Sequence, residues 1–120
     1  MDDEEAILEI YDILLAKMGH TTVCTASVAD ALAAFKEAQK KRAPFDVVVL
    51  DLNMGDGDKG GREALAAMRI LDPGIRAIVS SGLSAPRMAI ECSQHGFNLA
   101  ISKPFRAQDV VDAFKKISDQ

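Results

Sequence analysis

The sequence has 120 residues, of which 48% are hydrophobic and 27% are charged, and its formal net charge is −4. This length suits one domain that buries a core without disulfides or a structural metal, and the composition argues against a disordered chain. The acidic balance argues against direct binding to nucleic acid or to a membrane surface, and no apolar run is long enough to cross a membrane. We therefore expect a single cytoplasmic domain over residues 1–120, with no signal peptide in its acidic start.

The first half of the chain predicts two helices and one buried strand. Apolar residues recur at helical spacing over residues 7–18, and Gly19 provides a stop. A short β-branched run occupies residues 21–25, and Ser27 opens the second helix. The unbroken apolar run that follows at residues 45–50 is typical of a parallel strand covered on both faces.

The second half repeats this alternation. Helices are expected at residues 62–71, 86–95 and 108–117, and strands at residues 75–80 and 97–102. A loop rich in glycine and aspartate is expected at residues 55–61. Strands that alternate with helices at intervals of roughly 25 residues indicate repeated βαβ units, and hence an α/β fold with a parallel sheet.

The series begins with a helix, so the strand that should precede this helix is truncated or missing. We expect Met1 to be the last residue of that strand, in a chain that starts late. Two alternatives remain open: the other strands could close the gap, or another chain could donate a strand by swapping.

Polar residues stand at the points where the predicted strands end. Asp51, Ser81 and Lys103 follow strands, and Asp2 and Asp3 stand where the first strand would end. The carboxyl ends of the strands form the ligand-binding edge of an open α/β sheet, so these side chains are expected at one rim. Taken singly, each has an ordinary explanation as a turn residue, a helix-end acid or a solvated lysine. Their joint placement favours a functional site.

The types of these residues predict magnesium and phosphoryl chemistry. Crowded carboxylates repel one another, and Mg²⁺ relieves the repulsion because it prefers carboxylate and carbonyl oxygens. A carboxylate can attack phosphorus and form an acyl phosphate. A lysine ammonium and a hydroxyl can then stabilise the charge of the phosphoryl group.

Four segments carry a resemblance to a known family: DDEE at residues 2–5, VVLDLNM at 48–54, SSG at 80–82 and KPF at 103–105. Over essentially its whole length the chain resembles the receiver domain of two-component response regulators. Residues 60–65, together with the SSG segment, further resemble receivers attached to hybrid sensor histidine kinases. The resemblance implies a three-layer, doubly wound α/β fold whose parallel sheet has the flavodoxin-like strand order 2-1-3-4-5, with the first strand truncated or missing in this chain.

The resemblance also implies roles for the residues at the rim. Asp51 would be the phosphoacceptor, taking a phosphoryl group from the phosphohistidine of a histidine kinase. Lys103 would pair with the phosphate, and its bond to Pro104 is commonly cis in the family. Ser81 would be the switch hydroxyl that turns inward to the phosphoryl oxygen.

A cofactor and partners follow from the same resemblance. Mg²⁺ would be held by Asp2, Asp3, Asp51 and the backbone carbonyl of Asn53. The partners would be a histidine kinase or phosphotransfer domain, with a homodimer or strand-swapped assembly as a further expectation. The domain would not be an enzyme beyond self-catalysed phosphotransfer and slow autodephosphorylation.

Two positions depart from the usual receiver pattern. Gly55 stands where many receivers have proline, and Ala100 stands where a tyrosine or phenylalanine commonly serves as the output switch. Two other functional classes stay open. One is a receiver-like interaction module that is not phosphorylated. The other is an aspartate-nucleophile phosphatase of the haloacid dehalogenase type, which would need an aspartate where Asn53 stands.

The cysteines and histidines are expected to be structural. Cys24 and Cys92 match no metal or redox spacing, so we expect them in or near the core. His20 and His95 follow predicted helix ends beside glycines, where positive charge is favourable.

Overall fold

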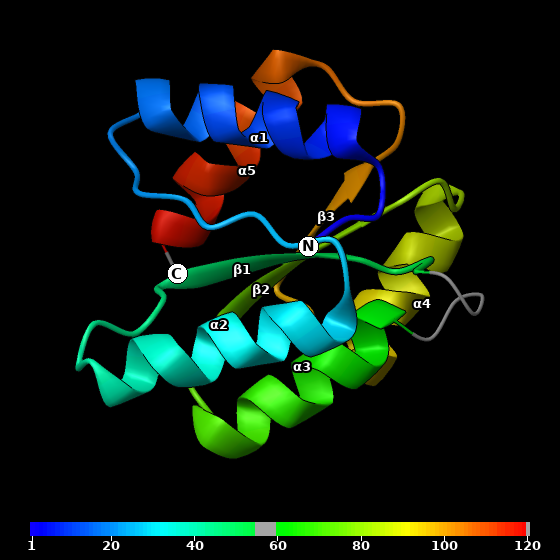
Figure 1. The fold of residues 1–120 in the computed structure, drawn as a ribbon. Helices are drawn as coiled ribbons and strands as arrows, with labels where there is room; N and C mark the ends of the chain where they lie inside the picture. Colours follow the sequence, from blue (N-terminus) through cyan, green and yellow to red (C-terminus); the bar gives the residue numbers. More distant parts are fainter. Residues whose placement is uncertain (55–59, 120) are drawn as a thin grey trace.

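The computed structural model describes residues 1–54 and 60–119, so the expectations for Gly55 and for residues 56–59 lie outside the described residues. In chain order the elements are α1 Glu5–Lys17, α2 Val28–Lys40, β1 Val47–Asp51, α3 Gly60–Leu71, β2 Arg76–Ser81, α4 Ala85–His95, β3 Leu99–Ser102 and α5 Ala107–Ser118 (Figure 1). Within the described ranges, no helix combines the length and apolar character that a membrane span requires.

The strands form one parallel sheet in the order β1-β2-β3. Val49 pairs with Ile78, and Ile78 pairs with Leu99 on its other side. Helices α1 and α5 cover one face of the sheet, and α2, α3 and α4 cover the other (Figure 1). This arrangement confirms the predicted three-layer, doubly wound α/β fold.

Alternation of side chains along β2 divides the core into two clusters. Ala77 and Val79 pack in the cluster with α2 and α3, and Ile78 packs in the cluster with α1 and α5. All three residues are fully buried. A strand covered on both faces needs apolar residues at successive positions, which explains the unbroken apolar runs in the sequence.

Met1 lies beside β1, where the first strand is expected. Its nitrogen donates to the carbonyl oxygen of Val49 at 2.8 Å, and its carbonyl oxygen accepts from the N–H of Asp51 at 3.0 Å. Two such bonds on either side of Leu50 form one step of a parallel ladder. Among the described residues, this single step stands where the first strand of the sheet is expected.

The β-branched run at residues 21–25 is not a strand. A strand needs a neighbour with which to exchange backbone hydrogen bonds, and within the described chain this run makes one such bond, from the N–H of Asp2 to the carbonyl oxygen of Thr25. Cys24 lies on this run and is exposed, so the expected core position is wrong for Cys24. Cys92 is half-buried against the core.

Several element ends differ by one or two residues from the sequence expectations. Helix α3 begins at Gly60, two residues before the predicted start, and so takes in the last part of the predicted loop. His95 is the last residue of α4, and Gly96 follows it with a left-handed φ of 78°. His20 follows α1, and its ring lies 5.6 Å from that of Phe114. These positions agree with structural roles for both histidines.

Candidate functional site

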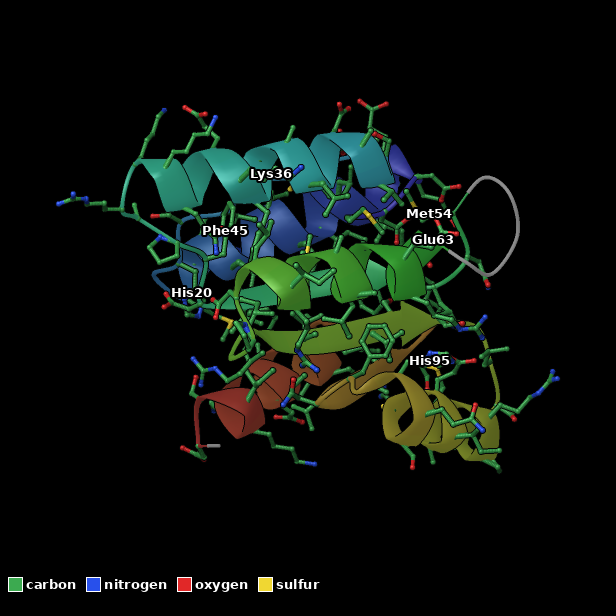
Figure 2. All side chains as sticks on the ribbon, turned by 90° about the horizontal axis from the view of Figure 1, so that it is seen from below. His20, Lys36, Phe45, Met54, Glu63 and His95 are labelled. Atoms are coloured by element: carbon green, nitrogen blue, oxygen red, sulfur yellow. The ribbon has the colours of Figure 1, made fainter. Side chains whose placement is uncertain are left out.

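Asp51 is the last residue of β1 and lies at the carboxyl edge of the sheet. Its side chain is buried, with 3% of the residue exposed. Its N–H donates to Met1, and its Oδ1 accepts from the N–H of Asn53 at 3.3 Å. In Figure 2 this end of the molecule is found by the labelled residues Met54, which follows β1, and Glu63, which lies in the first turn of α3. The strand and the turn after it therefore hold the Asp51 carboxylate in place.

Asp2 and Asp3 approach Asp51 from the segment ahead of α1. Asp2 is 2% exposed, and its N–H is fixed by the carbonyl oxygen of Thr25. Its Oδ1 accepts from the N–H of Glu4 at 2.9 Å. Asp3 is exposed to solvent. One carboxylate oxygen from each aspartate lies within 4.8 Å of the other two, so the structure brings the three predicted metal-binding carboxylates together.

Lys103 reaches this cluster from the end of β3. Its ammonium donates to Oδ2 of Asp2 at 2.7 Å and lies 3.4 Å from Oδ1 of Asp51. Its backbone N–H donates to the carbonyl oxygen of Ser81 at 2.7 Å, and its bond to Pro104 is cis, as the resemblance implied. Lys103 is thus placed between the two buried carboxylates, and its shorter contact is with Asp2.

The cluster carries unbalanced negative charge, because three carboxylates face one ammonium. Burial raises the pKa of Asp51, and the charge of Asp2 raises it further, while Lys103 and the N–H of Asn53 act in the opposite direction. Burial would lower the pKa of Lys103, but its hydrogen bond to Asp2 and the charge of Asp51 outweigh burial and raise it. The lysine therefore stays protonated, and its single positive charge does not balance all three carboxylates.

The donor set suits a hard divalent cation. Mg²⁺ binds about six oxygen ligands at roughly 2.0–2.1 Å and keeps several waters among them. The carboxylate oxygens of Asp2, Asp3 and Asp51 lie close enough together to share one such ion. Because Asp3 is exposed, the cluster is open to the waters that would complete the shell. Oxygen ligands favour Mg²⁺ over the metals that prefer nitrogen or sulfur.

The raised pKa of Asp51 predicts how stability depends on pH. An acid whose pKa is higher in the folded state than in the unfolded state favours the unfolded state when it ionises. The fold is therefore progressively destabilised as the pH rises from 3.8, the ordinary pKa of the group, through the raised pKa of Asp51. Without divalent cations, Asp51→Asn is therefore expected to increase the free energy of unfolding at neutral pH by on the order of 1 kcal/mol, because it removes a buried negative charge. Lys103 is not left without a partner, since it keeps its hydrogen bond to Asp2. The increase should shrink towards zero in acid.

Urea unfolding in EDTA over a range of pH measures this effect. Asp46→Asn is the matched control, because Asp46 is exposed and lies just before the same strand, at the end away from Asp51. A variant at residue 51 that is less stable than the native protein at neutral pH would contradict the account of the Asp51 carboxylate.

Ser81 and Asn53 lie at the predicted rim with different contacts. Ser81 ends β2 and is fully buried, and its hydroxyl accepts from the N–H of Leu83 at 3.3 Å. No hydrogen bond joins Ser81 to Asp51 within the described residues. Asn53 is exposed and contacts Asp51 through its N–H, whereas the resemblance assigned its carbonyl to the metal.

Gly61, in the first turn of α3, is a part of the site that the strand-end pattern does not identify. A Cβ at this position would lie 2.7 Å from the carbonyl oxygen of Asp51. The start of α3 can therefore approach the end of β1 this closely only without a side chain. Consecutive glycines at the start of a helix, where glycine is otherwise unfavourable, are the signal that points to this approach.

Gly61→Ala is expected to destabilise the fold by about 1–3 kcal/mol, because the end of β1 or the start of α3 must move. Helix propensity alone predicts the opposite sign, since alanine is the better helix former by roughly 1 kcal/mol. Chemical denaturation measures the change. Gly74→Ala is the control, because the nearest atom to a Cβ there is 3.7 Å away. Equal stability of Gly61→Ala and the native protein would show that the contact with the carbonyl oxygen of Asp51 leaves room for a Cβ at residue 61.

Comparison with known proteins gives consistent matches. Residues 1–115 match the sequence profile of the response regulator receiver domain. The alginate biosynthesis transcriptional regulatory protein AlgB of Pseudomonas aeruginosa is 32% identical over 104 residues, which is 87% of this chain and 22% of that protein. The photosynthetic apparatus regulatory protein RegA of Rhodobacter capsulatus is 31% identical over 113 residues, 94% of this chain and 58% of that protein. The chain thus corresponds to only part of each relative.

A solved structure shows the same architecture. The receiver domain of NtrX from Brucella abortus aligns with a TM-score of 0.83 and 25% identity, covering 99% of this chain and 95% of that one. The likeness extends over all the elements that carry the aspartate cluster and Lys103.

Proposed function

Because the chain belongs to the family of response regulator receiver domains, we propose that Asp51 accepts a phosphoryl group from the phosphohistidine of a histidine kinase or phosphotransfer domain, in a reaction that depends on Mg²⁺. The observation that carries the proposal is the cluster of three carboxylate oxygens within 4.8 Å, with the Lys103 ammonium beside the Asp51 carboxylate. Receiver domains are signalling domains, and phosphorylation would switch a surface that a partner reads.

The proposed step is a displacement at phosphorus. A carboxylate oxygen of Asp51 forms a bond to phosphorus, and the bond from phosphorus to the donor's histidine nitrogen breaks, which leaves an acyl phosphate on Asp51. The Lys103 ammonium, 3.4 Å from Asp51, would stabilise negative charge on the phosphoryl oxygens. Asp2, Asp3, Asp51 and the carbonyl of Asn53 would hold Mg²⁺, which would supply further neutralisation of that charge. Later attack by water would release phosphate slowly.

Ser81 supplies the proposed switch. Its hydroxyl now accepts from the N–H of Leu83 at 3.3 Å, at the start of the segment that leads into α4. Turning that hydroxyl towards a phosphoryl group on Asp51 would break this contact and loosen the segment. Ala100 is exposed on β3 and has no ring to rotate, so the change would pass through Ser81 and the residues after it.

Intact-mass measurement after incubation with acetyl phosphate and Mg²⁺ tests the proposal. The native protein should gain the mass of one phosphoryl group, and EDTA should prevent the gain. A folded protein that gains no mass would favour the unphosphorylated interaction module. Rapid multiple turnover of a phosphomonoester would instead favour the phosphatase.

A hollow beside the site suggests where the phosphodonor protein docks. It has a volume of about 430 Å³ and is lined by Glu4, Ile7, Ile10, Lys103, Pro104 and Phe105. Ile10 is 41% exposed there, and Ile13 on the same helix is 57% exposed. Apolar surface of this kind beside a reactive group suits a partner protein. The free thiols of Cys24 and Cys92 support a reducing, cytoplasmic setting for that partner.

Ile10→Glu is therefore expected to lower phosphotransfer from a protein donor by about tenfold or more, while phosphorylation by acetyl phosphate stays unchanged. Phosphotransfer profiling with a panel of autophosphorylated histidine kinases measures the first rate, and intact mass measures the second. Ile70→Glu is the matched control, since Ile70 is 82% exposed on α3. Equal losses for both donors would place the defect in the site and contradict a docking role.

A further inference from the structure

Helix α4 is attached to the rest of the domain by few buried side chains. All 11 of its residues lie in the described part of the chain, and the two that are buried are Met88 and Glu91. Cys92 is half-buried against the core, whereas Ile90 is exposed. Helix α5, which has a similar length, instead buries apolar side chains along one whole face. A charged side chain therefore supplies one of the main attachments of α4.

Glu91 is paired with Arg62, which lies in the first turn of α3. The guanidinium donates from Nε to Oε2 of Glu91 at 2.8 Å, and its Nη2 donates to Oε1. Nε2 of His95 lies 3.7 Å from the same carboxylate, but His95 belongs to α4 and moves together with Glu91. In Figure 2 the labelled residues nearest to the pair in sequence are Glu63, in α3, and His95, in α4. The Arg62–Glu91 pair thus joins α4 to α3.

The Arg62 end of this pair is fixed to the strand that carries Asp51. Arg62 follows Gly61, where an added Cβ would lie only 2.7 Å from the carbonyl oxygen of Asp51, so the start of α3 rests directly on the end of β1. The Glu91 end belongs to α4, which is connected to Ser81 through the short segment of residues 82–84. Arg62 is therefore the stationary side of the contact, and α4 is the side that can move.

The pair depends closely on the position of α4. Two parallel N–H···O bonds require the guanidinium and carboxylate planes to stay aligned, and such bonds weaken steeply when their angles fall. Glu91 lies in the second turn of α4, and the backbone hydrogen bonds of the helix transmit a shift of its first turn to the second. A displacement of the start of α4 by roughly an ångström would therefore disturb both bonds at once.

We propose that the Arg62–Glu91 pair is an inhibitory restraint, which holds α4 in its unphosphorylated position and opens when Ser81 turns towards a phosphoryl group on Asp51. This inference rests on the proposed function and adds a regulatory element to it. Turning Ser81 would displace residues 82–84 and the start of α4, while Arg62 stays with β1. The two side chains would then separate, and the Glu91 carboxylate would move into water, where its charge is hydrated.

The restraint has a thermodynamic consequence for phosphorylation. A contact that exists in one of two states opposes any ligand that favours the other state. The pair would therefore lower the affinity of the site for a phosphoryl group, and phosphorylation would weaken the pair by the same factor. Loss of the pair should favour the active arrangement. An ion pair that only supports the fold would leave that affinity unchanged or lower it when lost.

Beryllofluoride with Mg²⁺ mimics a phosphoryl group on a carboxylate, and it tests the opening in the native protein. The Nε–H of Arg62 donates to Glu91 and gives its own NMR signal. Its exchange with water should become about tenfold or more faster once beryllofluoride is bound. Unchanged exchange of this N–H in the beryllofluoride complex would overturn the restraint alone. Absence of beryllofluoride binding would overturn the proposed function, and the restraint with it.

Two variants remove the pair with opposite changes of charge. Glu91→Gln removes a negative charge and Arg62→Gln removes a positive one, yet both should raise the affinity for beryllofluoride by about fivefold or more in an NMR titration. A long-range effect of charge would move the two affinities in opposite directions. The double variant should gain no more than the larger single gain, because the same contact is lost in each case. Opposite shifts, unchanged affinities or additive gains would overturn the proposal.

Glu37→Gln is the matched control for the change of charge. Glu37 forms an exposed pair with Lys41 on α2, at 3.5 Å, so its loss removes the same charge without a contact to α4. Its affinity for beryllofluoride should equal that of the native protein, and an equal gain in this variant would contradict the restraint. Circular dichroism checks the fold of each variant. Should Arg62→Gln not fold, Glu91→Gln and the exchange of the Arg62 Nε–H in the native protein still decide the question.

Discussion

Asp51→Asn is expected to abolish the gain of phosphoryl mass that acetyl phosphate and Mg²⁺ produce in the native protein. The amide of asparagine is not a nucleophile towards phosphorus, and it removes one of the three carboxylates that would hold the cation. The loss should be complete, because among the described residues Asp51 is the carboxylate that is both buried at a strand end and contacted by Lys103 and Asn53. Intact-mass spectrometry measures the outcome.

Asp46→Asn provides the control for this loss. Asp46 is exposed and lies just before the same strand, at the end away from the cluster, so its variant should be phosphorylated to the native extent. Circular dichroism of both variants should show a native fold. Phosphorylation that persists in Asp51→Asn would assign the phosphoryl group to another residue and refute the proposed function.

Lys103→Met is expected to lower the free energy of unfolding by about 3–5 kcal/mol in EDTA at neutral pH. Methionine retains the apolar stem of lysine but leaves the buried carboxylates of Asp2 and Asp51 without a positive partner. Such a loss is a large share of the roughly 5–15 kcal/mol that stabilises a domain of this kind. Urea unfolding followed by circular dichroism measures it.

Two additions should restore part of the stability of Lys103→Met. Mg²⁺ would supply the missing positive charge, so it should stabilise this variant more than the native protein. Acid should also help, because protonation of the unpaired carboxylates removes their charge. Lys115→Met, at an exposed position on α5, should change stability by no more than about 0.5 kcal/mol. Equal effects at the two lysines would contradict the role of Lys103 as counter-charge.

The fold was predictable because its main signals are local. Each signal specifies one element from a short stretch of sequence. The apolar run before Asp51 specifies a strand, and the helical spacing of residues 108–117 specifies a helix. Parallel strands bring their carboxyl ends to one edge whatever their separation in sequence. Asp51, Lys103 and Ser81 could therefore be assigned to one rim before any distance was known.

Features that depend on neighbours were predicted poorly. Residues 21–25 have the composition of a strand, yet they lack a partner along most of their length and remain irregular. Cys24 is exposed for the same reason, because it lies on that segment. The approach of Gly61 to the carbonyl of Asp51 joins two elements in space, and strand-end reasoning contains no information about it.

The sequence by itself determined the α/β architecture, the edge of the sheet where the site lies, and the acidic and basic residues that meet there. Only the tertiary structure decided that Lys103 bonds more closely to Asp2 than to Asp51, that the hydroxyl of Ser81 faces Leu83, and that one edge of β1 borders a cavity. The physical reason is that periodicity and strand ends are set by residues close together in the sequence. The choice of hydrogen-bond partner and the presence of a cavity depend instead on how segments that are distant in the sequence pack together.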